Sequence, residues 1–369
     1  MNRSLLITNC TKHNKNDEAL FFLNEVSDSI DLVGWDWSHG RTEEIQFESI
    51  KKRITVPKKF GSFISRFWAL CVLIFKARRS KLHKVYDYVY INSFEMLIIS
   101  NFLGIKAKKK FYEISDIFSF FTELNFLSSL MRYIEKVSCK NCFFVISSPA
   151  YFDYIKNYLN KSPVVYPKYN WLSFFYYSDN NNYSQENSVG RQKEDKKVLY
   201  NGILRSKYTY EFLKSLSKKT NITAKLAGLT QFKLPLKTEG IQYVGEYNDK
   251  RLDEIMDDVD FVLTCDIGDD WNSKNLITNR FFQAILFGKY QISVGNCLIS
   301  KIIKKLEIGH VLDFDLKSLD LEKVLKRSKN IENKIYIFKE HLMRIEINPL
   351  KNKTTLSSSG IEEFFQFNR

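Results

Sequence analysis

One turn near the middle of the chain combines a glycine with two cations. Within residues 198–207, an apolar strand pattern runs into Gly202, and Arg205 and Lys207 follow before a helix pattern begins near Tyr208. Gly202 lets the backbone bend closely, and the free N–H groups and dipole of a helix N-terminus favour anions. A diphosphate would fit this arrangement, although a solvated loop with two ordinary cations explains the same residues. Neither G-x-x-x-x-G-K-[ST] nor G-x-G-x-x-G occurs.

A second group of polar residues follows in the same half of the chain. The strand pattern at 241–244 ends in Gly245, Glu246 and Tyr247, and residues 275–294 combine a helix, a glycine stop and a strand. Amide side chains suit hydrogen bonds to sugar hydroxyls, and a guanidinium suits phosphate. The candidates for such contacts are Asn275, Asn279, Arg280 and Gln283. For Gln283, helix capping or solvation is an equally good interpretation.

Two carboxylates in the first half could act on a substrate hydroxyl. Glu113 lies near the end of the strand pattern at 110–114 and Asp116 just after it, and one of them could accept a proton as general base. Alternatively, one is a helix N-cap and the other pairs with a lysine at 108–110. Residues 246–270 hold ten carboxylates, which a solvated helix face and a polar loop explain. No metal is therefore expected.

The positive charge of the chain is concentrated in one segment. The net charge is +14, and residues 51–110 alone contribute +13, with fifteen Lys and Arg against two acids. This segment should attract nucleic acid, an anionic membrane or a phosphorylated substrate. No nucleic-acid reader motif accompanies it, so nucleic acid is not the expected partner.

A helix expected at 63–84 joins apolar bulk to cations. It contains Phe67 and Trp68 near its start and Arg78 and Arg79 near its end, as in an interfacial helix. The simpler alternative is a core helix with a solvated basic end. The longest apolar stretch, at 67–75, is nine residues, well below the roughly 20 needed to span a bilayer. With scattered cysteines and no signal-peptide pattern, we expect a cytoplasmic protein, peripheral on the inner membrane face.

Short apolar runs alternate with helical patterns along the whole chain, which is typical of βαβ units and parallel sheets. Strands are expected at 5–8, 31–35, 86–91, 110–114, 143–146, 164–166, 197–201, 224–227, 241–244, 261–264 and 290–294. The sequence predicts an α/β fold with two Rossmann-like, doubly wound domains facing across a cleft. The first covers 1–177, a polar linker 178–197, and the second 198–345, followed by a tail at 346–369 that could pack back on the first domain. In such sheets, ligands bind outside the carboxyl ends of the strands.

The order of these motifs resembles the carboxy-terminal domain of GT-B glycosyltransferases, most of all the family-4-like retaining group of bacterial polysaccharide biosynthesis. By this resemblance, Arg205 and Lys207 match the pair that holds the donor diphosphate, and residues 244–247 match the loop near the nucleotide base. That group begins its donor helix with Glu-x7-Glu, whereas this chain has amides at Asn275 and Gln283. The first half resembles the group through Y-E-x-x-D at 112–116 and through residues 147–152, S-S-P-A-Y-F, which look like the S-P-x-F turn of that group. Glu113 and Asp116 would then line the acceptor side.

The resemblance implies a glycosyltransferase that moves a sugar from a nucleotide diphosphate to a glycan or polyprenyl-linked acceptor, in capsule or O-antigen synthesis, with retention of configuration. The nucleotide sugar is a co-substrate, and neither a cofactor nor a metal is expected. The alternatives are an inverting GT-B enzyme with Asp116 or Glu113 as base, a nucleic-acid-binding protein, and a non-catalytic GT-B partner subunit. The sequence does not specify the donor sugar, nucleotide base, acceptor, linkage or oligomeric state.

Overall fold

The computed structural model of the protein contains two compact units. One comprises Met1–Tyr169 and Glu346–Arg369, and the other comprises Asn170–Ile345. The residues described are 2–11, 14–36, 47–57, 63–117, 125–160, 162–169, 196–220, 222–235, 238–247, 249–316, 328–345 and 348–367. Most of the linker predicted at 178–197 lies outside them. Each unit is described by itself.

Unit 1 is built on a seven-stranded sheet in the order β3-β2-β1-β4-β5-β6-β7, and all its strand pairs are parallel. The strand order reverses between β1 and β4, as in a doubly wound fold. The strands are β1 (Arg3–Thr8), β2 (Ser29–Asp36), β3 (Ile50–Pro57), β4 (Val85–Asn92), β5 (Lys106–Ile114), β6 (Phe143–Ile146) and β7 (Val165–Pro167).

Helices cover both faces of this sheet. Helix α3 contacts α2 on one side and α5 on the other, so these three form one layer, and α5 also contacts the π-helical turn η1. Helix α1 connects β1 to β2, in the opposite direction along the sheet, and right-handed crossovers therefore place it on the other face. The elements are α1 (Asn14–Asn24), α2 (Phe63–Arg79), α3 (Phe94–Phe102), α5 (Phe126–Ser138), α6 (Ala150–Tyr154) and η1 (Ile155–Leu159).

The end of the chain belongs to unit 1. Leu356 forms an antiparallel bridge with Val165 of the edge strand β7. The amide of Asn348 donates to the Phe22 carbonyl at 3.1 Å. The buried ring of Tyr169 packs against Phe364 in the short helix α15 (Ile361–Phe364), with 5.4 Å between ring centroids. The terminal segment thereby covers one edge of the sheet.

Unit 2 repeats the architecture with six parallel strands in the order β10-β9-β8-β11-β12-β13. Its order reverses between β8 and β11. The strands are β8 (Lys197–Asn201), β9 (Thr223–Ala227), β10 (Ile241–Gly245), β11 (Phe261–Leu263), β12 (Tyr290–Val294) and β13 (Gly309–Leu312). The helices are α8 (Lys207–Thr220), α9 (Asp249–Asp257), α10 (Trp271–Asn275), α11 (Asn279–Leu286), α12 (Leu298–Leu306) and α14 (Ser328–Arg344).

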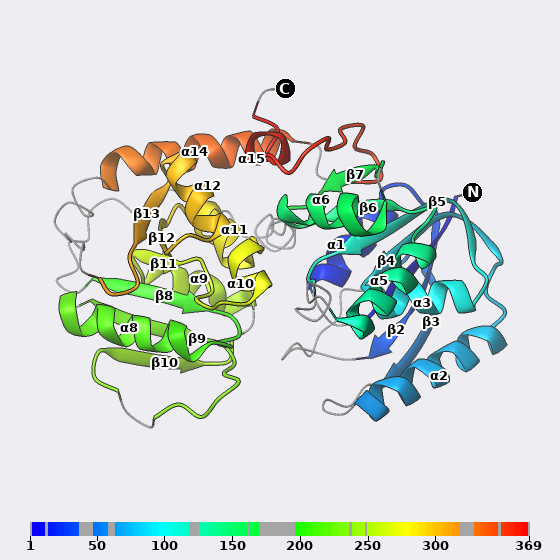
Figure 1. Ribbon diagram of the computed structural model, residues 1–369, viewed down its shortest axis with the longest axis horizontal. Helices are drawn as coiled ribbons and strands as arrows, with labels where there is room; N and C mark the ends of the chain where they lie inside the picture. The colour runs from blue at the N-terminus through cyan, green and yellow to red at the C-terminus, as the bar shows by residue number, and fades with distance from the viewer. Residues whose placement is uncertain are drawn as a thin grey trace. The chain divides into compact units, whose positions relative to one another are not determined.

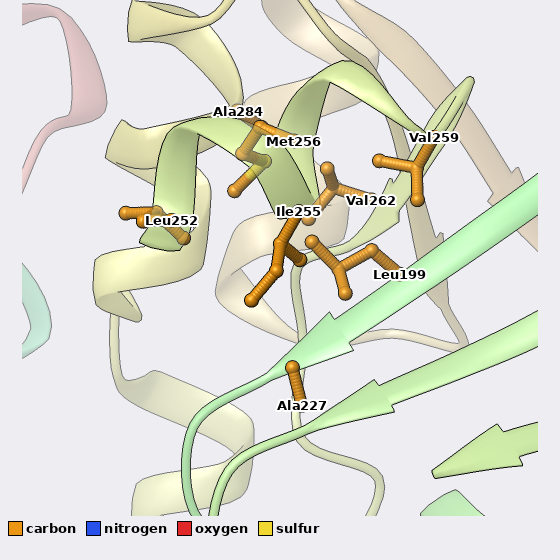
Figure 2. Close-up of a cluster of buried hydrophobic side chains, with 8 residues drawn as sticks. All are labelled: Leu199, Ala227, Leu252, Ile255, Met256, Val259, Val262 and Ala284. Atoms are coloured by element: carbon orange, nitrogen blue, oxygen red, sulfur yellow. The ribbon is translucent and has the colours of Figure 1, made fainter. Parts of the chain in front are cut away.

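The core of unit 2 lies where α9 meets the middle of the sheet. Figure 2 shows one face of α9 directed at side chains from β8, β9, β11 and α11. Its apolar positions recur at helical spacing, which gives this helix a single face to bury. The cluster contains Leu199, Ala227, Leu252, Ile255, Met256, Val259, Val262 and Ala284. It lies directly beneath the carboxyl ends of β8 and β9.

The predicted α/β fold with two parallel-sheet domains is confirmed. The strands predicted at 143–146, 197–201 and 290–294 agree with the structure to the residue. The sequence does not predict β3, in which the cations Lys51, Lys52 and Arg53 directly follow the first residue and which lies at the sheet edge, where one side is solvated. It also missed β13, α10, α14 and α15. The helix at 63–84 ends earlier than expected, at Arg79.

Candidate functional site

Three glycines shape the carboxyl edge of the sheet in unit 2. Gly202, Gly228 and Gly245 end the neighbouring strands β8, β9 and β10, and their φ angles are 113°, 124° and 81°. A Cβ atom on Gly228 would lie 2.0 Å from the Gly202 carbonyl oxygen, so these two strand ends touch backbone to backbone. A Cβ atom on Gly245 would meet nothing within 4 Å. The three glycines themselves carry no side chain, but Arg280 Nη1 would lie 3.4 Å from a Cβ atom on Gly202, and the Tyr243 hydroxyl donates to the Gly228 carbonyl at 2.9 Å.

Arg205 and Lys207 lie on the turn that leaves this edge. Both side chains are exposed, and Lys207 is the first residue of α8, next to the helix N-terminus. Asp266, just beyond β11, lies within electrostatic range of Arg205. Burial opposes ionisation of Asp266, but the charge of Arg280, hydrogen bonds and the charge of Arg205 outweigh it and lower the pKa of Asp266. The charge of Arg205 therefore acts where the strand order reverses, between β8 and β11.

Arg280 lies beneath the edge. It is 6% exposed, and its guanidinium donates to the Asn201 carbonyl at 3.0 Å and to Asp266 Oδ1 at 2.5 Å. The same guanidinium stacks 4.1 Å above the Tyr200 ring, whose hydroxyl also donates to Asp266. The phosphate contact that the sequence predicts for Arg280 stays a prediction, and in the structure its guanidinium braces β8 against the loop after β11.

Gln283 is likewise committed inside the protein. It is 5% exposed, and its Oε1 accepts a 2.6 Å hydrogen bond from the Asn201 side chain, which also donates to the Tyr247 hydroxyl at 3.0 Å. Tyr247 follows β10, so this network joins both ends of the glycine edge to α11. The Asn201 Oδ1 atom is buried and has no hydrogen-bond partner among the described residues.

The remaining predicted donor residues are spread around this edge. Asn275 ends α10, where its amide donates to the Trp271 carbonyl at 2.9 Å. An extended stretch from Leu276 to Thr278 separates it from Asn279, the first residue of α11. Asn275 and Gln283, which the resemblance assigns to one donor helix, therefore belong to two helices, α10 and α11. Glu246 is exposed beyond β10.

The structure separates the two predicted carboxylates of unit 1. Glu113 is wholly buried near the end of β5, where it accepts hydrogen bonds from Tyr90 at 2.8 Å, from Lys168 at 2.9 Å and from Ser115. Asp116 is exposed, three residues further on. Of the two, only Asp116 reaches solvent.

Lys168 is the cation that neutralises Glu113. It is 0% exposed and also pairs with Glu18 of α1 at 2.9 Å. Burial opposes its charge, but the two carboxylates outweigh burial and raise the pKa of Lys168. The expected partners at 108–110 are engaged elsewhere, since Lys108 pairs with Asp87 at 2.7 Å and Lys110 donates to the Asn101 side chain.

The predicted interfacial residues of α2 are exposed. Phe67 and Trp68 are 57% and 65% exposed. Arg78 donates to the Phe102 carbonyl at 2.9 Å, and Arg79 lies 4.4 Å above the Phe75 ring. Among the residues that the structure describes, none of the helices has the length and apolar composition needed to span a bilayer. Within the same residues, no cluster of three or more His, Cys, Asp or Glu side chains could hold a metal ion.

Several residues of the site were not predicted from the sequence. Asn201 and Tyr200 belong to a strand that reads as ordinary core, and Asp266 was counted among solvated acids. Their partners lie far along the chain, as in the Asn201–Gln283 bond, which spans 82 residues. The one available signal was a polar residue, Asn201, at the end of a buried strand.

Comparison with solved structures places the fold in a known class. Sucrose-phosphate synthase from Thermosynechococcus elongatus superposes with a TM-score of 0.62 at 11% identity, over 91% of this chain and 94% of that one. WaaG, a glycosyltransferase involved in lipopolysaccharide biosynthesis, gives 0.57 at 12% identity, over 94% and 97%. Anabaena HepE in complex with UDP gives 0.59 at 12% identity, over 92% and 95%. No protein-family model and no curated protein matches the sequence.

These neighbours and the two doubly wound units define the class: the protein has the GT-B fold of glycosyltransferases. The chain leaves the first unit after Tyr169 and returns to it at Glu346.

Proposed function

We propose that this protein is a glycosyltransferase that moves a sugar from a nucleotide diphosphate to a glycan or polyprenyl-linked acceptor. The observation that carries the proposal is the carboxyl edge of unit 2. There, the strand-end glycines Gly202, Gly228 and Gly245 adjoin two exposed cations, Arg205 just before α8 and Lys207 at its first residue. The likeness to a HepE structure that contains UDP and to another that contains UDP-glucose supports a nucleotide-sugar donor.

The chemistry expected of this edge is stabilisation of a leaving diphosphate. As the bond between the anomeric carbon and the diphosphate breaks, negative charge builds up on the phosphate oxygens. Arg205, Lys207 and the positive end of the α8 dipole would stabilise that charge, and preorganised groups of this kind are usually the largest single contribution to catalysis. Because the cations are supplied by the protein, we also propose that transfer needs no metal. Activity that persists in excess chelator would support this part.

Asp116 is the carboxylate proposed for the acceptor side. It is exposed, whereas Glu113 is buried against Lys168, so a direct role in proton transfer falls to Asp116. We propose a retaining reaction, in which Asp116 orients the acceptor and stabilises positive charge on the sugar ring. In an inverting reaction it would instead be the general base. Proton NMR of the first-formed product distinguishes the two by its anomeric configuration.

The biological setting proposed is bacterial surface polysaccharide synthesis on the cytoplasmic side of the membrane. The likeness to WaaG supports this setting. Helix α2 ends in Lys76, Arg78 and Arg79, all exposed, and each cation near an anionic surface is worth about 1 kcal/mol. We propose peripheral attachment through this helix.

The decisive experiment is a thermal-shift screen of the full chain against nucleotide sugars that differ in base and sugar. A rise in melting temperature with one donor class supports the proposal. Arg205→Ala and Lys207→Ala should each reduce the shift at a fixed donor concentration, whereas Lys218→Ala, at an exposed lysine in the last turn of α8, should leave it unchanged. If no nucleotide sugar shifts the melting temperature, the non-catalytic alternative is favoured. Tight, steeply salt-dependent binding of nucleic acid in a filter assay would favour the nucleic-acid alternative.

A further inference from the structure

Helix α5 presents its polar side to the protein and its apolar side to solvent. Ser128, Arg132 and Glu135 are its buried residues. Its exposed face carries Phe126 (83% exposed), Leu127 (56%), Leu130 (43%), Tyr133 (65%) and Val137 (58%). Positions 126, 130, 133 and 137 recur at helical spacing and form one stripe. An ordinary surface helix has the reverse pattern.

Specific contacts hold α5 in this orientation. Glu135 accepts hydrogen bonds from the Tyr112 hydroxyl of β5 at 2.7 Å and from the Tyr154 hydroxyl of α6 at 2.6 Å. The Asn125 side chain caps the helix by accepting from the Ser128 backbone N–H at 2.8 Å. Rotating the helix to bury its apolar stripe would break the bonds to Glu135 and leave both tyrosine hydroxyls without them. The stripe is thus fixed outward by the sheet beneath it.

The neighbouring helices extend this apolar surface. Because α3 contacts both α2 and α5, the outward sides of the three helices form one continuous layer over the sheet (Figure 1). Phe67, Trp68 and Phe75 of α2 and Phe102 at the end of α3 are each more than half exposed. Exposed apolar side chains gathered in such number on one layer of helices indicate an interaction surface.

The charges on this layer select the occupant. Helices α2 and α5 contain one carboxylate between them, Glu135, and it is buried. Among the side chains that the structure describes, the exposed cations of these two helices are Lys76, Arg78 and Arg79 of α2 and Lys136 of α5, and Lys140 follows α5. An apolar surface surrounded by cations complements an anionic lipid surface, whose acyl chains accept the stripe and whose phosphates meet the cations. Trp68 and Tyr133 suit the boundary between the two.

We propose that α5 is a second membrane-binding element, which inserts its apolar stripe into an anionic bilayer beside α2. The two helices contribute differently. Attachment by the cations of α2 weakens with added salt, whereas insertion of the α5 stripe is insensitive to salt because it depends on apolar burial. The inference extends the proposed attachment through α2 but does not depend on sugar transfer.

The test is flotation of the full chain with vesicles of phosphatidylcholine, with and without phosphatidylglycerol, at low and high salt. Phe126→Ser/Leu130→Ser/Tyr133→Ser should lower partitioning into the anionic vesicles by about a hundredfold or more and remove the salt-resistant fraction. Arg78→Glu/Arg79→Glu should remove chiefly the salt-sensitive fraction. The matched control is Tyr336→Ser/Ile337→Ser on α14, which alters two similarly exposed apolar residues (48% and 58%) of unit 2 and should leave partitioning unchanged.

Two results would overturn the inference. One is a triple variant that partitions like the unaltered chain. The other is a chain that ignores vesicles but forms a dimer that the triple variant loses in light scattering, since the stripe would then join two copies. Circular dichroism and the melting temperature verify that the triple variant is folded. A preserved thermal shift with the donor separates a failure of this inference from a failure of the proposed enzymatic function.

Discussion

Replacing Lys168 with methionine would leave two carboxylates in the interior of unit 1 without their cation. Lys168 is fully buried and lies 2.9 Å from both Glu18 and Glu113, which are 3% and 0% exposed. Removing one partner of a buried ion pair costs about 3–5 kcal/mol, because the remaining charge is desolvated and uncompensated. For a unit of this size, that corresponds to a fall in melting temperature of roughly 6–20 °C.

Differential scanning calorimetry is the appropriate assay, since it can resolve the melting of the two units. Lys108→Met is the matched control: it breaks the pair with Asp87, in which the lysine side chain is 77% exposed, and solvent-exposed pairs of this kind contribute little to stability. Combining Lys168→Met with Glu18→Gln and Glu113→Gln should restore most of the lost stability, because no unpaired charge remains.

The deficit of Lys168→Met should also depend on pH. Without the lysine, burial would raise the folded-state pKa of Glu18 and Glu113 above the unfolded value of about 4.3. The folded variant then binds more protons than the unfolded chain in the window above that value. Its stability should fall as pH rises through this window and recover as pH falls. A variant that melts within about 2 °C of the unaltered chain at neutral pH would refute the reasoning.

Three further predictions concern the site and α5. Arg205→Ala or Lys207→Ala should weaken the binding of nucleoside diphosphates by about tenfold or more, which corresponds to the loss of one charge-assisted hydrogen bond. The binding of the free nucleoside should change little. Calorimetric titration measures both affinities, and equal losses for the two ligands would contradict the prediction. Gly228→Ala should destabilise unit 2 more than Gly245→Ala. Both substitutions force alanine into a left-handed φ, but only Gly228→Ala places a Cβ atom against the backbone, at 2.0 Å. Urea denaturation compares the two variants, and equal effects would contradict the packing argument. Burial raises the pKa of Glu135, so the stability of the folded chain should fall as pH rises above the pKa that Glu135 has in the unfolded chain. Glu135→Gln should flatten this pH dependence of the melting temperature. An unchanged slope would show that Glu135 is not its source.

Local patterns in the sequence predict most strands of the two sheets, but not the edge strands β3 and β13. The strand at 197–201 and its Gly202 turn could be predicted because a short apolar run followed by glycine has few alternatives. Strand β3 could not, because its first three cations hide an edge strand that is only half buried. The apolar period of α5 predicts a helix with an apolar face, but periodicity does not tell which face turns inward. In α5 the inward face is the one that carries Glu135, because Glu135 accepts hydrogen bonds from Tyr112 of β5 and Tyr154 of α6.

The same limit applies to the candidate site. Arg280 and Gln283 were placed correctly at the start of a helix, but their neighbours Asp266 and Asn201 come from other elements. A polar side chain with an unseen long-range partner is indistinguishable in sequence from one that awaits a ligand. Arg205 and Lys207, in contrast, lie on a turn with few neighbours to engage them. Their expected exposure followed from local reasoning alone.

The return of the last residues to unit 1 has a consequence for biosynthesis. Unit 2 is one uninterrupted stretch of chain, whereas unit 1 needs Asn348, Leu356 and Phe364 to complete it. On the ribosome, unit 2 can therefore finish folding first, while the β7 edge and the Tyr169 ring wait for their cover. Until then, β7 offers an unpaired edge to other nascent chains. A stop codon shortly before residue 348 should thus cause aggregation of the amino-terminal part, although every residue of its sheet is present.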